Sequence, residues 1–208
     1  MDRFDGAIAG LGTRSGVRLV VGMWRDSPLG PVTDVMMERP DGHRTLIAPT
    51  PTVADYISTT YTFDEVRVEP VALTVEGAGR LAVRTPSVEL ELTTGRRTAV
   101  GLLLTLVPRP LARTRGWCHL IDPAARLARP GVRTVGSAGS ARREYYCALD
   151  EHQLTSASVR VDGHDPGPLT PVTPPVRFGF GSTPTRPTLV RVTTLIVEDT
   201  PGGAAGVP

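Results

Sequence analysis

The sequence predicts a mainly β (α+β) fold, in which a single domain is built from a curled antiparallel sheet or barrel with one or two short helices. Three observations support this prediction. Apolar and polar residues alternate in many short runs that are rich in β-branched residues and Leu. Gly- and Pro-rich turns separate these runs, whereas helical patterns are few. A chain of 208 residues, 40% of them apolar, can bury about 70% of its unfolded surface in one domain.

The first half of the chain contains most of the predicted strands. A hairpin is predicted around Pro40-Asp41-Gly42, because each of these residues suits its position in a turn. The continuous apolar run 100–107 is typical of a central strand. The predicted strands are residues 17–24, 32–38, 44–48, 66–76, 80–84, 88–93 and 100–107.

The second half of the chain contains further strands and a long loop. The predicted strands are residues 142–148, 154–161, 176–180 and 189–197. Residues 165–187 are rich in Pro and Gly without a regular period, so we expect an ordered loop with one short strand inside it. We expect the domain to cover residues 1–198 and to be followed by a disordered tail, residues 199–208, which has little to bury.

Two short helices are predicted between these strands. Thr52 is placed to cap the N-terminus of a helix over "VADYISTTY", and Asp55, three residues later, would be the acid of a capping box. A second helix is expected within residues 111–127, interrupted near Gly116 and at Asp122-Pro123. These helices are too few and too short to change the predicted fold class.

The basic residues of the chain are all Arg, and Lys and Asn are absent. Because Arg stays protonated in proteins, the chain has no side-chain amine that could attack a carbonyl group. A formal net charge of +2 gives no reason to expect a nucleic-acid partner. Residues 109–133 contain six Arg and a single acid, Asp122. We interpret this segment as a solvated or salt-bridged surface, with an anionic partner as the alternative.

Membrane, secretory and metal-binding signals are not found in the sequence. No run of 18 apolar residues and no basic segment followed by an apolar core is present, which predicts a cytoplasmic protein without a membrane partner. Cys118 and Cys147 form neither a disulfide framework nor a metal-ligand spacing, and we interpret them as reduced structural thiols. The four His residues do not lie at ligand spacing either, so no metal or other cofactor is predicted.

A thiol and an imidazole are adjacent at Cys118-His119, which raises the question of a catalytic dyad. Neighbouring side chains in a strand point to opposite faces. We therefore interpret this pair as a buried Cys beside a half-exposed His.

Two stretches contain the candidate site residues. Asp34 follows the turn Ser27-Pro28-Leu29-Gly30-Pro31, and it is either the carboxylate of a site or an exposed hairpin residue. In "RREYYCALDEH", Glu144 and Tyr146 would share one face of a strand while Tyr145 and Cys147 share the other. On a barrel strand one face lines the interior, where Tyr side chains either orient a ligand or fill the core.

The order of these elements resembles the acetoacetate decarboxylase superfamily. A strand, "SPLGPVTD", a strand, a turn, a short helix, "RVEPVALTVEGAGRLAVRTPSVELEL" and a strand leading into "PLTPVTPPVRF" carry the resemblance, which spans residues 17–197. The resemblance implies a curled β-rich barrel with its site in the interior. It also implies that Asp34 stands where the family has a Glu beside its active site.

The chain departs from this family at two positions. The family's Schiff-base Lys follows the short helical segment, and the matching residues 55–60 contain no Lys. The family's N-terminal Arg has no counterpart either, because neither Arg14 nor Arg18 aligns with it. A covalent decarboxylase mechanism is therefore not expected.

The sequence leaves three functional readings open. We favour a protein that binds a small carbonyl- or carboxylate-bearing ligand inside the barrel without decarboxylating it, with Asp34 as polar anchor and an Arg as counter-ion. The first alternative is an acid/base enzyme for enolisation, hydration or cyclisation, in which burial raises the pKa of Asp34. The second is a structural or interaction protein with a filled barrel and the Arg-rich segment as its contact surface. Association into a homo-oligomer is left open. The ligand-binding candidates are Asp34, Tyr56, Tyr61, Glu144 and Tyr146.

Overall fold

The computed structural model describes residues 1–77, 79–129, 132–138, 142–179 and 183–198. Its strands are β1 (Asp2–Thr13), β2 (Arg18–Asp26), β3 (Val32–Glu38), β4 (Arg44–Ala48), β5 (Glu65–Val68), β6 (Ala72–Glu76), β7 (Arg80–Arg84), β8 (Val88–Arg97), β9 (Val135–Ala138), β10 (Arg142–Val161), β11 (Leu169–Thr170) and β12 (Thr188–Glu198). Its helices are α1 (Pro51–Ser58), α2 (Ala99–Thr105), α3 (Arg109–Ala112) and α4 (Arg115–Ala128). The predicted tail, residues 199–208, lies outside the described residues.

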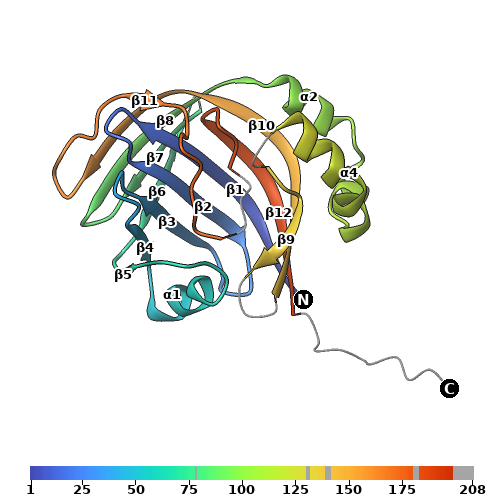
Figure 1. Cartoon of the computed structure of the whole chain (residues 1–208), viewed down its shortest axis with the longest axis horizontal. Coiled ribbons are helices and arrows are strands. Elements are labelled where there is room, and N and C mark those ends of the chain that lie inside the picture. Colours follow the sequence, from blue (N-terminus) through green and yellow to red (C-terminus); the bar gives the residue numbers. More distant parts are fainter. Residues whose placement is uncertain (78, 130–131, 139–141, 180–182, 199–208) are drawn as a thin grey trace.

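One curled sheet contains all of these strands and confirms the predicted mainly β fold (Figure 1). The strand order is β5-β4-β3-β2-β1-β12-β10-β8-β7-β6, with β11 paired to β1 and β9 paired to β10 off this path. The sheet is a curled half-barrel. It is mixed rather than purely antiparallel, because β5 runs parallel to β4 after the crossover through α1.

The strand β10 is 20 residues long and joins two parts of the sheet. Residues 142–148 and 154–161, predicted as separate strands, are the two halves of β10. The first half pairs with β12 and β9, and the second half pairs with β8. The pairing register shifts at Ala148/Asp150 and again between His152 and Ser156. Such irregularities bend a strand, which allows β10 to change partners along its length.

The structure adds β1 to the predicted strands and corrects others. The central strand β1 is not predicted by the sequence pattern, because "GAIAGLG" supplies small residues rather than an alternating β-branched pattern. The predicted strand 66–76 is divided into β5 and β6 on either side of Pro70, which has no N–H to donate to a ladder. Residues 176–179 form no strand, and Phe180 lies outside the described residues. The loop does contain one short strand among its described residues, β11, but at Leu169–Thr170 and not at the predicted position.

Most of the apolar run 100–107 lies in helix α2, which ends at Thr105, and not in the predicted central strand. A short apolar run suits a buried strand or a helix equally well, so its cap decides between them. The Thr98 side chain accepts a hydrogen bond from the Gly101 N–H and starts a helix there. The helix lies at the surface, where Leu102 and Leu103 are exposed.

The other helices also differ from their predictions. Helix α1 is capped by Thr50 rather than Thr52, because Pro51 occupies the first helical turn and the Thr50 side chain accepts from the Val53 N–H. The segment 111–127 forms α3 and then α4, and α4 runs through Pro123 without ending. The described residues thus contain four helices rather than one or two.

The two Cys residues meet between α4 and β10. Cys118 lies on a helix, so the opposite-face argument for Cys118-His119 is wrong. The Cys118 Sγ atom lies 2.8 Å from the Cys147 Sγ atom, and both Cys residues are buried and free. Contact with Cys147 and burial raise the pKa of the Cys118 thiol. This pair packs with Tyr145 and Leu195 and holds α4 against the sheet.

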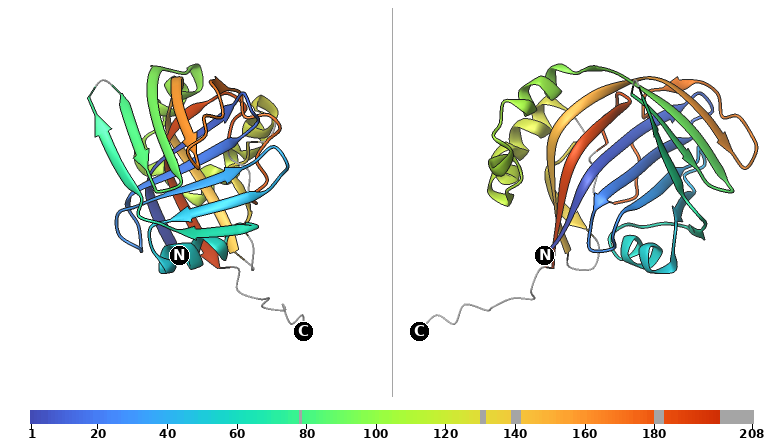
Figure 2. Two further views of the ribbon diagram at one scale, coloured as in Figure 1. Left: turned by 90° about the vertical axis from the view of Figure 1, so that its left-hand side faces the viewer. Right: turned by 180° about the vertical axis from the view of Figure 1, so that it is seen from behind.

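Strands β1–β4 are packed on both of their faces. One face meets β7, β8 and the second half of β10 in the largest apolar core, which includes Leu19, Val21, Ile47, Val83 and Leu90. Figure 2 shows the green strands β6–β8 lying across the blue strands β1–β3. The opposite face is covered by α1 through Val53 and Ile57. Among the described residues, no helix combines the length and the apolar character needed to cross a membrane.

A buried ion pair ties the loop 171–179 to strands β2 and β3. The Arg18 Nη2 atom lies 3.2 Å from the Glu38 Oε1 atom, and the two side chains are 2% and 0% exposed. Arg18 also donates to the Pro174 and Arg39 carbonyl oxygens. Glu38 accepts from the backbone N–H and the Nε of Arg177. These bonds satisfy most of the polar atoms of both side chains and fix the loop over the sheet.

We predict that Arg18→Met lowers the free energy of unfolding by roughly 3–5 kcal/mol, because it removes the buried guanidinium beside Glu38 and leaves that carboxylate with Arg177 as its remaining cationic partner. Urea denaturation measures this change. Adding Glu38→Gln to Arg18→Met should restore part of the loss, since that buried charge is then removed. The matched control is Arg84→Met, whose exposed pair with Glu91 is worth less than about 1 kcal/mol. Equal losses in Arg18→Met and Arg84→Met would contradict a structural role for the buried pair.

Candidate functional site

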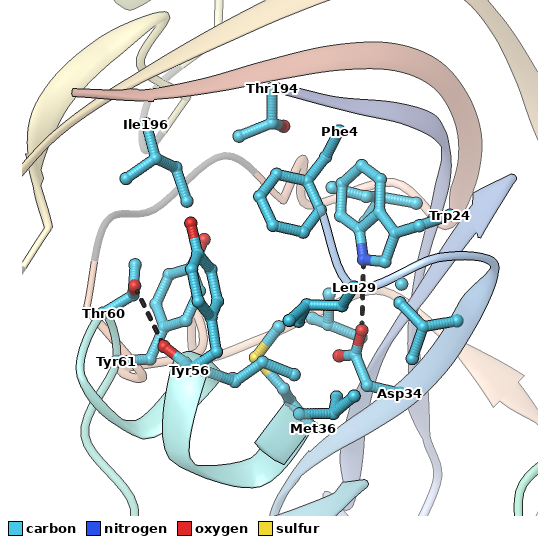
Figure 3. A pocket seen from close by; sticks show the side chains of 16 residues that line it. Phe4, Trp24, Leu29, Asp34, Met36, Tyr56, Thr60, Tyr61, Thr194 and Ile196 are labelled. Carbon is cyan, nitrogen blue, oxygen red and sulfur yellow. Dashed lines mark hydrogen bonds between the residues drawn. The ribbon is translucent and has the colours of Figure 1, made fainter. Parts of the chain in front are cut away.

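A small cavity lies between α1 and the face of the sheet that α1 covers (Figure 3). Its volume is about 50 Å³. The apolar side chains of its wall include Phe4, Ile8, Val20, Leu29, Met36 and Ile196. Its polar side chains are Trp24, Asp34, Tyr56, Thr60, Tyr61 and Thr194. Three of the five predicted ligand-binding residues therefore lie in one cavity wall.

Strand register brings these side chains to one face. Asp34 pairs with Gly22 across β3 and β2, and Phe4 pairs with Thr194 across β1 and β12. Directly paired residues of antiparallel strands point to the same side of a sheet. The two Tyr residues come from the other wall, where Tyr56 lies on α1 and Tyr61 follows its C-terminus. The helix begins at Thr50-Pro51 because a Thr cap and a Pro in the first turn are both favourable there.

Asp34 is a buried residue of this cavity and not an exposed hairpin residue. It is 1% exposed. Its Oδ1 atom accepts a hydrogen bond of 3.2 Å from the Trp24 indole N–H, while its Oδ2 atom is buried without any partner. Burial raises the pKa of Asp34 to about 7, and the Trp24 bond only partly offsets this rise. Figure 3 shows the carboxyl group directed toward the cavity.

Gly22 creates the space that Asp34 and Trp24 occupy. A Cβ atom on Gly22 would lie 2.4 Å from Asp34 Oδ1 and 2.7 Å from Trp24 Nε1. The bond between Asp34 and Trp24 therefore requires Gly at this position. Sequence reasoning missed both Gly22 and Trp24. With β2 and β3 paired in register, a Gly directly opposite a buried Asp is a signal that could have found this position.

Tyr61 and Glu144 form the second polar group of the site. The Tyr61 hydroxyl donates a hydrogen bond of 2.7 Å to the Glu144 Oε2 atom. Glu144 is 2% exposed, and burial raises its pKa to about 7 despite the bond from Tyr61. Burial and the Glu144 charge raise the pKa of Tyr61 well above its usual value, and the Asp34 charge acts in the same direction. Glu144 thus reaches the cavity through Tyr61 and not with its own carboxyl group.

The Tyr56 ring lines the cavity, but its hydroxyl is directed to the sheet. It donates a hydrogen bond of 2.8 Å to the Asp2 Oδ2 atom. Burial, and then the bond to Asp2, raise the pKa of Tyr56. The guanidinium carbon of Arg142 lies 5.1 Å from the centre of the ring. Tyr56 therefore supplies an aromatic wall, and its hydroxyl is already engaged.

Tyr146 lies outside this cavity, although it shares a face of β10 with Glu144. It packs with Val190 and Val192 and borders a separate apolar cavity of about 110 Å³ beneath α4. Its burial raises its pKa. The structure thus places Tyr146 in the core around the site rather than in the cavity wall.

The charge of the cavity wall differs from the sequence-based expectation. No Arg or His is among the described residues of the wall, so the expected Arg counter-ion of Asp34 is not found there. Asp34 therefore relies on protonation, not on ion pairing, to be buried at acidic and neutral pH. No group of His, Cys, Asp and Glu in the described ranges could hold a metal ion.

The cavity does not lie in the barrel interior, where the site was expected from the sequence. The half-barrel has two packed faces, and the large apolar core fills the space between β1–β4 and β7–β8. The cavity lies on the other face, beneath α1. A ligand in this cavity can therefore contact Asp34 without displacing the side chains of the large core.

Protein-family models, curated proteins and solved structures give no match to the chain. The resemblance to the acetoacetate decarboxylase superfamily therefore stays a prediction from sequence, and the cavity itself carries the functional argument.

Proposed function

We propose that the cavity beneath α1 binds a small, largely apolar molecule that bears one carbonyl or carboxyl group, and that it does so without covalent chemistry. The observation that carries this proposal is the Asp34 Oδ2 atom, which is buried in the cavity wall without a partner. A buried polar atom without a partner costs free energy of about 1–3 kcal/mol. A ligand group that bonds to Asp34 removes this cost.

The protonation state of Asp34 selects the ligand group. With a pKa of about 7, the carboxyl group is largely neutral below neutral pH. A neutral carboxyl donates one O–H hydrogen bond, which suits a carbonyl oxygen or the oxygen of a ligand carboxyl group. An ionised Asp34 would repel a ligand carboxylate. Affinity for such ligands should therefore fall as the pH rises above 7.

The walls and volume restrict the rest of the ligand. Apolar side chains form most of the wall, so the remainder of the ligand is apolar. A volume of about 50 Å³ compares with roughly 10–15 Å³ needed for one water molecule. The cavity is therefore equivalent to roughly three to five water molecules. A short-chain ketone or oxo acid has the required size and polarity.

The absence of Lys separates this proposal from the covalent chemistry of the acetoacetate decarboxylase superfamily. That chemistry needs an amine that forms an imine with the substrate ketone, and the chain has Arg instead of Lys throughout. We therefore infer binding without decarboxylation by an imine route.

A second candidate function is acid/base catalysis, and the two carboxyl groups with raised pKa values favour it. Both Asp34 and Glu144 have a pKa of about 7, which is where a general acid or base works best at neutral pH. Asp34 would remove and return a proton on the carbon next to a ligand carbonyl. Tyr61, whose hydroxyl donates to Glu144, would connect that carboxyl group to the cavity. Deuterium exchange into 2-pentanone, followed by NMR, distinguishes this candidate from binding alone.

The first prediction for this site concerns affinity. Asp34→Ala should weaken binding of 2-pentanone or acetoacetate by roughly 1.5–3 kcal/mol, because it removes the hydrogen bond to the ligand carbonyl. The melting temperature should hold or rise, since the buried acid is costly in the empty protein. Isothermal calorimetry and thermal unfolding measure the two effects. Asp55→Ala, on the exposed side of α1, is the control. Unchanged affinity in Asp34→Ala would contradict the proposed role of Asp34 in binding the ligand.

The second prediction concerns the pH dependence of stability. Burial raises the pKa of Asp34 from 3.8 to about 7, so the folded state binds the proton more tightly than the unfolded state. This contribution is fully present below the unfolded pKa and is lost as the pH rises toward 7. Asp34→Asn keeps an acceptor for Trp24 and cannot ionise.

The difference in free energy of unfolding between Asp34→Asn and the wild type should grow in favour of the variant by roughly 2–3 kcal/mol between about pH 5 and pH 8. Urea denaturation at both pH values checks this. The exposed variant Asp55→Asn should show no such trend. A parallel pH dependence in wild type and Asp34→Asn would mean that Asp34 is not held neutral by burial.

The third prediction concerns covalent trapping. Borohydride in the presence of acetoacetate should leave every internal peptide at its unmodified mass, because no side-chain amine can form an imine. Peptide mass spectrometry measures this. Reduction of an adduct onto an internal peptide would overturn the noncovalent mechanism.

A further inference from the structure

A second hollow lies on the face of β1 and β2 opposite the cavity beneath α1. Its volume is about 500 Å³, and it opens between the sheet and α3. Strand register places Ala7, Met23 and Arg191 side by side on this face, one residue out of phase with Ile8 and Gly22. Four Arg side chains reach the hollow: Arg25 from β2, Arg109 from α3, Arg113 directly after α3, and Arg191 from β12. We call this hollow the arginine cleft.

The arginine cleft carries positive charge that the described residues do not neutralise. Within the described ranges, Arg25, Arg109 and Arg191 are exposed and form no ion pair. The closest carboxylate to Arg113 is that of Asp5, at 3.9 Å, and the Arg113 Nε atom is buried without a hydrogen-bond partner.

The carboxylate of Asp5, the acid of the cleft wall, already accepts hydrogen bonds from other residues. It accepts a hydrogen bond of 2.6 Å from the Arg3 Nε atom and another from the Thr193 hydroxyl. Burial raises the pKa of Asp5, but these two bonds, together with the charges of Arg3 and Arg113, outweigh it and keep the pKa below its usual value. One ionised carboxylate thus stands against four guanidinium groups.

Arg residues from the same part of the chain behave differently outside the cleft. Arg97 pairs with Asp150, Arg126 pairs with Asp122, and Arg129 pairs with Glu151. The Arg-rich segment 109–133 is therefore divided by the fold. Arg126 and Arg129 form salt bridges, whereas Arg109 and Arg113 join Arg25 and Arg191 around the cleft.

We propose that the arginine cleft binds the phosphate group of a small organic phosphate. Guanidinium groups form paired hydrogen bonds with phosphate oxygens, and a phosphate monoester carries close to two negative charges at neutral pH. Several Arg residues around one hollow suit such a dianion better than a single carboxylate, which one Arg would satisfy.

The shape of the cleft indicates a small molecule rather than a polymer. A volume of about 500 Å³ falls within the roughly 300–1,000 Å³ of small-molecule sites. Ala7, Met23, Leu149 and Val192 add an apolar wall beside the Arg residues. A smaller hollow of about 110 Å³ shares Arg109, Leu149 and Arg191 and extends the cleft beneath α2, where the Asp150 carboxylate in its wall is paired with Arg97. The ligand therefore combines a phosphate with a short apolar part.

Calorimetry with butyl phosphate and with inorganic phosphate tests this proposal on the full chain. The wild type should bind butyl phosphate more tightly than inorganic phosphate, because the alkyl part contacts the apolar wall. The double variant Arg109→Gln/Arg191→Gln should weaken binding about tenfold or more, as two charge-assisted interactions are lost. Arg25→Gln provides an independent single variant, and thermal unfolding without ligand reports whether each variant is folded.

Two controls separate the site from general charge effects. Arg96→Gln removes an exposed Arg that lines no part of the cleft and should change affinity less than about twofold. Asp34→Ala, on the opposite face, should leave phosphate binding unchanged, so this proposal and the proposed function fail separately.

Several outcomes would overturn the proposal. These are absence of butyl phosphate binding to the wild type, equal weakening by Arg96→Gln, and tighter binding of glutarate than of butyl phosphate. Binding to vesicles that contain phosphatidic acid without binding of free butyl phosphate would also overturn it, because the lipid surface would then be the ligand.

Discussion

The long strand β10 is the constraint on which both candidate sites depend, because two parts of the sheet share it. Its first half pairs with β12, and its second half pairs with β8. The register shifts between Ala148 and Ser156 bend the strand between these partners. Since β8 carries β7 and β6, the bend brings all three over β1–β4 and encloses the apolar core. Before the bend β10 presents Glu144 to Tyr61, and at the bend Leu149 borders the arginine cleft.

Buried carboxyl groups are accommodated in this fold in two physically different ways. Glu38 and Glu151 form ion pairs with buried or half-buried Arg residues, so electrostatic attraction and hydrogen bonds offset their desolvation. Asp34 and Glu144 have no cationic partner of this kind and are instead shifted toward the neutral form. The first arrangement stabilises the fold at neutral pH. The second leaves hydrogen-bonding capacity in the cavity wall that a ligand can use.

The two faces of the sheet thus differ in their electrostatics. Beneath α1 the titratable side chains are acids and Tyr residues in an apolar wall, which suits a neutral ligand with one polar atom. On the opposite face, four Arg residues surround a more open hollow, which suits a dianion. The strands β1, β2 and β12 contribute to both hollows, since alternate residues of each strand point to opposite faces.

The local preferences of the chain follow from residues that are close together in sequence. Alternation predicted β3, β4 and β7 with their observed bounds, and the missing Lys excluded a side-chain imine on composition alone. The turn before Asp34 also drew attention to the residue that proves to be buried in the cavity wall. These features depend on few residues that are close in sequence, so periodicity and residue chemistry are enough to recognise them.

The remaining features depend on contacts that form when the chain folds. The small residues of β1 become a central strand because β2 and β12 flank them, and the start of α2 is held on β10 because the Thr98 hydroxyl donates to Glu151. Tyr146 is separated from the cavity although it is near Glu144 in sequence. The pKa of Asp34 depends on Trp24, on the space above Gly22 and on the cover that α1 provides. Burial, ion pairing and pKa arise from contacts between residues that are distant in the chain, and local sequence patterns do not encode those contacts.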